Sequence, residues 1–301
     1  MASLPNSETF RTVLEQLQTG VYLVDKDRRI VFWNDGAERI TGYLRHQVLG
    51  HSCRENILTD CDEKSCGLCG TGCPLSETLH EGRPKEAHVF FHHKQGHQVP
   101  VLLRVAPIRD EHGSIVGAAR SFEPQVADST TNEDLARYGC LDPTGVPNHA
   151  FTQSHLRACL ATFNEHHVPF SIIGVHVDRL RKVQATHGHE ATAAILRAAA
   201  GTIKNVIGPN SFVGRWMENE FLAILTAPTQ SQVDKTVEKI EKVVSRSSVK
   251  WWDDPLLVHV TVGHTAVQAG DTLESLTERV GRMRQSAVLG AKAASAAGLG
   301  L

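Results

Sequence analysis

The chain has 301 residues, enough for two domains of ordinary size, each with its own hydrophobic core. Its 31 basic and 33 acidic residues nearly cancel, so no overall field favours nucleic acid or an anionic membrane as the partner. The first residues lack a basic segment followed by an apolar one, and no apolar run approaches the ~20 residues of a membrane-spanning helix. We therefore expect a soluble, cytoplasmic protein that binds neither nucleic acid nor membrane.

The N-terminal part of the chain alternates short apolar runs with turns. An apolar stripe at Phe10, Val13, Leu14 and Leu17 predicts a helix over residues 7–17. Apolar and β-branched runs bounded by charged turns then predict strands. The expected elements are strands over residues 20–24 and 29–34, a helical segment over 35–44 with a stop at Gly50, and strands over 86–92, 98–108 and 114–121.

Two strands, short helices and a three-stranded meander in this order resemble a PAS sensor domain. The resemblance is carried by Gly20–Asp25 and by residues 30–34, 40–43 and 113–117, which read IVFWN, ITGY and GSIVG. It covers the chain from residue 7 to residue 123 and implies an antiparallel sheet with short helices. Such a domain binds a small ligand, or it dimerises and transmits strain.

Five cysteines interrupt this pattern within residues 51–75, a segment rich in Gly, Asp and Ser. They are Cys53, Cys61, Cys66, Cys69 and Cys73. The Cys-x2-Cys spacing is usual for tetrahedral zinc, and several thiolates followed by Pro are also compatible with an iron–sulfur cluster. A thiol–disulfide redox switch and ordinary reduced thiols remain open. If the meander folds back, histidines could add nitrogen ligands: His51, His88, His92, His93 and His97.

A polar stretch over residues 124–140 predicts a linker with at most two helical turns. Helices and strands alternate beyond it, which predicts an α/β layer structure with helices over a central sheet. The expected elements are helices over 149–166, 187–207, 230–245 and 272–286, strands over 170–177 and 256–262, and a hairpin whose strands include 211–213 and 221–225. Residues 291–301 are rich in Ala and Gly, and we expect a flexible tail there.

Two segments of this second half carry a family resemblance. Residues 142–148 read DPTGVPN, and residues 215–221, at the tip of the expected hairpin, read RWMENEF. Both resemble motifs of diguanylate cyclases, whose signature is usually Arg-x-Gly-Gly-Asp/Glu-Glu-Phe and gives the GGDEF domain its name. The resemblance covers residues 141–290. It implies GTP as substrate, Mg²⁺ as cofactor, and cyclic di-GMP as the product of two facing domains.

The chain departs from this pattern where the family carries out its reaction. The resemblance places the two metal-binding carboxylates at His176 and Asn219, so that Glu220 is the acidic residue of the signature that remains. Imidazole is a poor ligand for Mg²⁺, which prefers oxygen. Met217 and Glu218 stand in place of two glycines that let the backbone approach phosphate closely. We therefore expect no intact catalytic set.

The positions that the family uses for guanine are also changed. The resemblance leaves Asn148 and Gln184 as nucleotide-binding candidates. Gln184 keeps an amide but adds a methylene, whereas Ala193 removes the acceptor for the amino group of the base. Recognition of GTP is therefore expected to be weakened together with metal binding.

Three functions are compatible with these observations. The first is a PAS sensor coupled to a degenerate, non-catalytic GGDEF domain that binds partner signalling proteins, dimerises or retains nucleotide. The second is an active diguanylate cyclase with a rebuilt site, in which Glu218 and Glu220 share one strand face and hold a transition metal with His176. The third is a metal- or redox-sensing PAS module with a purely structural second domain. We expect a homodimer, because both domain types commonly dimerise.

Overall fold

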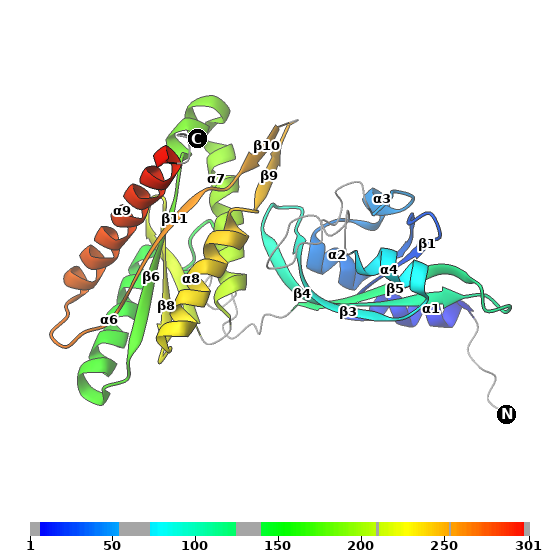
Figure 1. Ribbon diagram of the computed structural model, residues 1–301, viewed down its shortest axis with the longest axis horizontal. Coiled ribbons are helices and arrows are strands. Elements are labelled where there is room, and N and C mark those ends of the chain that lie inside the picture. The colour runs from blue at the N-terminus through cyan, green and yellow to red at the C-terminus, as the bar shows by residue number, and fades with distance from the viewer. Residues whose placement is uncertain (1–6, 54–72, 125–139, 209–210, 253, 298–301) are drawn as a thin grey trace. The chain divides into compact units, whose positions relative to one another are not determined.

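The structure is a computed structural model that describes residues 7–53, 73–124, 140–208, 211–252 and 254–297, with side chains described from residue 11 to residue 286 within these ranges (Figure 1). The chain divides into two compact units, Met1–Gln125 and Val126–Leu301. In the part of the chain described, no helix combines the length and apolar character that crossing a membrane requires.

The N-terminal unit is built on an antiparallel sheet. Its elements are α1 (Ser7–Gln16), β1 (Gly20–Asp25), β2 (Ile30–Trp33), α2 (Asp35–Thr41), α3 (Arg45–Val48), α4 (Pro74–Glu81), β3 (Lys85–His92), β4 (Gln98–Arg109) and β5 (Ile115–Pro124). The described strands form one five-stranded sheet in the order β2-β1-β5-β4-β3, and every neighbouring pair is antiparallel. The expected fold of two strands, short helices and a meander is confirmed.

The buried amide of Asn34 joins the first elements of this unit. Its Oδ1 accepts hydrogen bonds of 2.8 Å from the backbone N–H groups of Val21 and Ala37, and the second of these bonds caps α2. Its Nδ2 donates to the carbonyl oxygens of Leu14 and Thr19 at 2.8 and 2.9 Å. One side chain thus satisfies four backbone groups, in α1, in the connection to β1, in β1 and in α2, without leaving its own polar atoms unpaired.

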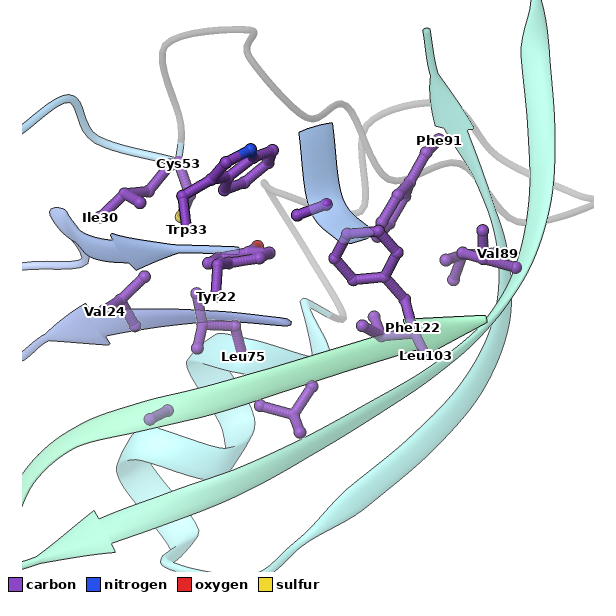
Figure 2. Close-up of a cluster of buried hydrophobic side chains, with 14 of the residues drawn as sticks. Tyr22, Val24, Ile30, Trp33, Cys53, Leu75, Val89, Phe91, Leu103 and Phe122 are labelled. Atoms are coloured by element: carbon purple, nitrogen blue, oxygen red, sulfur yellow. The ribbon is translucent and has the colours of Figure 1, made fainter. Parts of the chain in front are cut away.

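Aromatic side chains fill the core of the unit (Figure 2). Tyr22 and Trp33 lie with ring centroids 5.3 Å apart, and Phe91 and Phe122 meet edge to face at 4.9 Å. All four are fully buried or nearly so. These residues come from four different strands, so their contacts hold the sheet together across its width.

Two features of the N-terminal unit differ from the expectation. The helical segment predicted over residues 35–44 ends at Thr41, because Gly42 adopts a left-handed conformation (φ 76°) and its N–H bonds to the carbonyl of Glu38. A separate short helix, α3, follows. Helix α4 was not expected; it begins with Pro74 in its first turn and ends at Gly82.

The C-terminal unit is an α/β domain with a central antiparallel sheet. Its elements are α6 (His149–His166), β6 (Phe170–Val177), α7 (Leu180–Ile207), β7 (Ser211–Met217), β8 (Glu220–Thr226), α8 (Gln230–Val244), β9 (Ser248–Trp251), β10 (Asp254–Leu257), β11 (Val260–Ala266) and α9 (Leu273–Ala297). The central sheet has the order β11-β6-β8-β7, and β9 pairs with β10 in a separate two-stranded sheet. The predicted fold class is confirmed for this unit as well.

Helices cover both faces of the central sheet (Figure 1). Helices α6 and α9 share one buried cluster with the sheet, which contains Leu156, Leu160, Phe170, Ile172, Leu222, Ile224, Leu276 and Val280. Side chains alternate along a strand, so the intervening residues face the opposite side, which α7 and α8 cover. The hairpin of β7 and β8 therefore lies between two helical layers.

Several predicted boundaries in this unit are wrong. The strand expected over residues 256–262 is split between β10 and β11, which belong to different sheets, and β9 was not expected. Helix α7 begins at Leu180, well before residue 187, and is interrupted at Gly188, whose φ of 83° breaks the helical backbone. Helix α9 continues to Ala297, beyond its predicted end at residue 286 and into the expected tail over residues 291–301, whose flexibility stays a prediction.

Helix α9 packs very closely on the sheet at a pair of glycines. Gly174 of β6 and Gly263 of β11 are register partners. A methyl group on Gly263 would lie 2.6 Å from the carbonyl oxygen of Val280 and 2.7 Å from the backbone nitrogen of Arg284. Both atoms belong to the backbone of α9, so they cannot move aside as a flexible side chain would. The two glycines therefore set how near α9 lies to the sheet.

We expect Gly263→Ala to destabilise the protein by about 1–3 kcal/mol, because the helix must shift away from the sheet. Gly281→Ala is the matched control, since a methyl group there meets no atom within 4 Å. That control replaces a helical glycine by a better helix former, which should stabilise the protein by about 0.5–1 kcal/mol. Urea unfolding of the full chain, followed by circular dichroism, measures both. Equal effects of the two substitutions would contradict the close packing.

Candidate functional site

The candidate site lies at the end of the central sheet where β7 turns into β8. His176 near the end of β6 is the register partner of Glu220, the first residue of β8. Asn219 lies in the turn before β8, and its carbonyl oxygen accepts a 2.8 Å hydrogen bond from the N–H of Val177. The structure thus brings His176, Asn219 and Glu220 together, as the sequence predicts. We call these three residues, with Asp178 and Arg284, the hairpin cluster.

The polar groups of the hairpin cluster bond largely to one another. Asn219 Nδ2 lies 3.2 Å from His176 Nε2, and a neutral imidazole accepts that hydrogen bond. Burial lowers the pKa of His176, and the nearby Arg284 guanidinium lowers it further against the opposing carboxylates. Asp178 Oδ2 accepts a 2.7 Å hydrogen bond from Thr261 Oγ1. The lowered pKa favours the neutral form of His176, and its Nε2 is in contact with the Asn219 amide.

Arg284 is the member of the cluster that sequence reasoning missed. Its Nη1 lies 2.6 Å from Glu220 Oε1. A signal was present, since Arg284 follows Leu276 and Val280 at intervals of four residues along α9, and both of these are buried. A cation on an otherwise apolar stripe indicates that a buried anion faces it.

The cluster's donors are poorly matched to a hard divalent cation. Mg²⁺ prefers oxygen ligands in near-octahedral geometry, whereas the cluster offers an imidazole, an amide, the Glu220 carboxylate paired with Arg284 and the Asp178 carboxylate bonded to Thr261. In the described part of the chain, no three His, Cys, Asp or Glu side chains are grouped so as to hold a metal ion. The expectation that Glu218 and Glu220 share a strand face is wrong, because Glu218 lies in the turn between β7 and β8.

The two nucleotide-binding candidates have other partners in the structure. Asn148 caps α6, since its side chain accepts a 3.0 Å hydrogen bond from the N–H of Phe151. Gln184 lies in the first part of α7, where its Nε2 is 3.1 Å from His189 Nε2. The structure therefore gives Asn148 a role in the fold and leaves Gln184 on an exposed stretch of helix.

A second concave surface lies beside the hairpin. It is a pocket of about 500 Å³ lined by Asp142, His149, Arg215, Trp216, Met217 and Glu218. The Arg215 guanidinium lies 4.9 Å from the ring centroid of Phe221 and donates to the carbonyl oxygen of Glu218. Burial lowers the pKa of Arg215, against the pull of the nearby carboxylates of Asp142 and Glu218. These contacts of Arg215 hold the turn of the hairpin against β7.

Two of the five cysteines fall within the described residues. Cys53 and Cys73 are 3% and 5% exposed and belong to the same buried cluster of the N-terminal unit, in which Figure 2 labels Cys53. Cys61, Cys66 and Cys69 lie outside the described residues, so the predicted zinc or iron–sulfur site stays a prediction. Arg28 spans the two ends of this segment, because its carbonyl accepts from the N–H of Cys53 and its Nη2 donates to Ser76 Oγ at 2.6 Å.

The histidines of the β3–β4 hairpin form a stack. The rings of His93 and His97 are nearly parallel, with centroids 4.2 Å apart. Burial is the main cause that lowers the pKa of His93 to about 4 and that of His97 to about 3, and neighbouring histidines add to it. Both rings are therefore neutral near pH 7 and pack as apolar groups. Their expected role as nitrogen ligands of the cysteine segment stays a prediction, because Cys61, Cys66 and Cys69 lie outside the described residues.

A buried arginine in the same unit escaped the sequence reasoning. Arg120 of β5 is 1% exposed, and its Nη1 donates to the hydroxyl of Tyr22. Its guanidinium carbon lies 5.2 and 5.7 Å from the ring centroids of Tyr22 and Phe91. A charged group within an aromatic core is costly to bury, so these contacts are needed to retain it.

Comparison with known families agrees with this geometry. Residues 18–122 match the PAS domain model, and residues 141–290 match the model of the diguanylate cyclase GGDEF domain. The chain is a PAS–GGDEF signalling protein and is homologous to diguanylate cyclases.

Individual relatives are distant. Diguanylate cyclase DgcP of Pseudomonas aeruginosa is 21% identical over 246 residues, which are 81% of this chain and 35% of the relative. Diguanylate cyclase TpbB of the same organism is 25% identical over 134 residues, 44% of this chain and 30% of the relative. The chain thus spans about a third of the length of each.

Solved structures of similar fold are equally divergent. The GGDEF domain of DgcB from Caulobacter crescentus, solved with c-di-GMP, has a TM-score of 0.48 at 22% identity. The match covers 51% of this chain and 89% of the DgcB chain. Diguanylate cyclase SiaD of Pseudomonas aeruginosa, solved with its activator SiaC, has a TM-score of 0.49 at 23% identity, with coverages of 53% and 62%.

The stacked histidines give the stability of the protein a pH dependence. Below about pH 6.5 the unfolded chain takes up protons at both histidines, whereas the folded chain does so only near pH 4 and pH 3. The contribution of the two neutral histidines to the free energy of unfolding is therefore complete above about pH 6.5. It is lost as the pH falls, at about 1.4 kcal/mol per pH unit for each histidine.

Thermal unfolding between pH 7.5 and pH 4.5 tests this expectation. We expect the loss of stability at acid pH to be clearly smaller in the His93→Gln/His97→Gln variant than in the wild type. An unchanged slope in the double variant would show that other groups cause it.

Proposed function

We propose that this chain is a signalling protein in which a PAS sensor domain controls a catalytically inactive GGDEF domain. That domain acts by binding a partner protein or by retaining nucleotide without turnover. The observation that carries the proposal is the contact of 3.2 Å between His176 Nε2 and Asn219 Nδ2. These residues occupy the positions that the family resemblance assigns to metal-binding carboxylates. Here they are neutral and bond to each other.

Charge explains why this substitution matters. Condensing two GTP molecules brings triphosphates together, and metal ions must offset their negative charge. Two carboxylates would attract such ions, whereas an imidazole and an amide contribute no negative charge. His176 Nε2 is also in contact with the Asn219 amide, so a soft transition metal at this nitrogen would have to displace that contact. Both the usual site and a rebuilt site are therefore disfavoured.

On this proposal the protein transmits its signal through contacts of its surface with another protein, and not through a chemical reaction. The pocket beside the hairpin and the exposed Met217 of the hairpin, which is 59% exposed, offer contacts to another protein. We further propose that the protein acts as a homodimer in the cytoplasm. Because the chain spans only part of the length of its relatives, the assay described next decides whether it shares their activity.

We expect the purified full chain to form no cyclic di-GMP from GTP with either Mg²⁺ or Mn²⁺. The reason is the absence of carboxylate ligands at His176 and Asn219. Chromatographic separation of the nucleotides after prolonged incubation measures this. The control is Glu220→Gln, which removes the carboxylate that remains in the signature, and wild type and control should give the same background.

Product formed by the wild type above the Glu220→Gln background would overturn the proposed function. The same samples can be assayed for GTP binding by equilibrium dialysis. Binding without turnover would support a nucleotide effector role. Absence of binding would favour the protein-partner role.

We also propose that the cysteine segment makes the PAS domain sensitive to metal or redox state. Cys53 and Cys73 support the proposal, because both are buried in one cluster, so two of the five thiols belong to the same core. Zinc is the first expectation, and an iron–sulfur cluster is the second.

Protein purified anaerobically without added metal should contain about one zinc ion per chain by elemental analysis, because clustered thiolates bind zinc tightly. Removing it with a chelator should lower the unfolding temperature. The variant Cys66→Ser/Cys69→Ser should contain no zinc. An absorption band in the visible range would indicate an iron–sulfur cluster instead, and protein free of both metals would contradict the metal proposal.

A further inference from the structure

The ion pair of Arg284 and Glu220 ties the hairpin to the last helix of the chain. The two charged atoms are 2.6 Å apart, and the side chains keep only 21% and 14% of their surface exposed. Glu220 begins β8, whereas Arg284 projects from α9, which lies on one face of the sheet. The carboxylate that remains of the family signature is therefore already neutralised by a residue of its own chain.

The sheet is shaped to admit both members of this pair. A methyl group on Gly174 would lie 3.2 Å from Glu220 Oε1, and one on Gly263 would lie 2.9 Å from Arg284 Cβ. The two glycines are register partners on neighbouring strands. They leave the space that the carboxylate and the helix occupy, so the ion pair is built into the packing of the domain.

A carboxylate as buried as that of Glu220 needs a counter-charge. A guanidinium or a divalent ion can supply it, but the two repel each other and compete for the same oxygen. The rest of the hairpin cluster does not relieve this competition. His176 and Asn219 are neutral, and Asp178 is the other carboxylate, with one oxygen accepting from Thr261. A divalent ion would therefore have to displace Arg284, and among the other members of the cluster it would meet a negative charge only at Asp178.

We propose that Arg284 is the fixed counter-cation of Glu220 and that it keeps divalent metal ions out of the hairpin cluster. The inference rests on the proposed function, because a working cyclase would need metal ions at this end of the sheet. It goes further in naming the residue that takes over the charge-balancing role of the metal. It also implies that removing this one residue uncovers an affinity for divalent ions.

Binding of Mn²⁺ to the full chain tests the proposal directly. Free Mn²⁺ can be measured by electron paramagnetic resonance during a titration with protein. We expect wild type and Glu220→Gln to bind Mn²⁺ equally, because Glu220 is not available to the ion. We expect Arg284→Met to bind one additional Mn²⁺ at least roughly tenfold more tightly than any such site in the wild type, because the repelling charge is gone. The double variant Arg284→Met/Glu220→Gln should lose this site.

Thermal unfolding supplies a second readout. Arg284→Met leaves a buried carboxylate without its partner, so its midpoint should fall by roughly 5 °C or more. The double variant should recover most of that loss, and so should Arg284→Met when Mn²⁺ is added. The matched control is Arg282→Met on the same helix, where the side chain is exposed and the midpoint should stay near that of the wild type.

Two results would overturn the proposal. One is a Mn²⁺ site in the wild type that Glu220→Gln removes, a measurement that remains possible if Arg284→Met fails to fold. The other is an Arg284→Met protein that folds but gains no Mn²⁺ site. Neither result depends on product formation. Cyclic di-GMP made by the wild type would instead contradict the proposed function, so failures of the two proposals can be told apart.

Discussion

The close contact of α9 with the sheet at Gly174 and Gly263 is the constraint on which the C-terminal domain depends. It allows the apolar side chains of Leu276 and Val280 to enter the core shared with α6. The same approach carries Arg284 to the end of the sheet, where it meets Glu220. Core packing and the electrostatics of the candidate site are therefore set by one contact. A change in the distance between helix and sheet would alter both together.

In the N-terminal domain, a polar side chain has a comparable position. Asn34 is fully buried, yet all of its hydrogen-bonding groups are used, because it bonds to backbone atoms of α1, β1 and α2. Such a residue specifies one arrangement of three elements, since any other arrangement leaves buried polar atoms unpaired. Hydrophobic burial alone would tolerate several arrangements. The PAS core thus combines an aromatic interior, which would tolerate several arrangements of the elements, with the Asn34 side chain, whose hydrogen bonds fit one arrangement.

The sequence predicts those elements whose signals are local. Helix α6 and strand β6 have the predicted bounds, because Asn148 caps the helix and an apolar run that is buried along nearly its whole length defines the strand. The signals fail where structure depends on distant residues. The run over residues 256–262 looks continuous, but β10 pairs with β9 while β11 pairs with β6. Arg284 could be noticed as a cation on an apolar stripe, but its partner could not be named, since Glu220 lies far away in the sequence.

A tethered cation differs in kind from a bound metal ion. A metal ion leaves when its concentration falls and arrives together with a nucleotide, so a metal site responds to the solution. A guanidinium cannot leave, and its distance from Glu220 changes only when α9 or the hairpin moves. A domain of this kind can therefore report conformation rather than ligand supply. This is the property that an output domain needs if a sensor earlier in the same chain is to control it by strain alone.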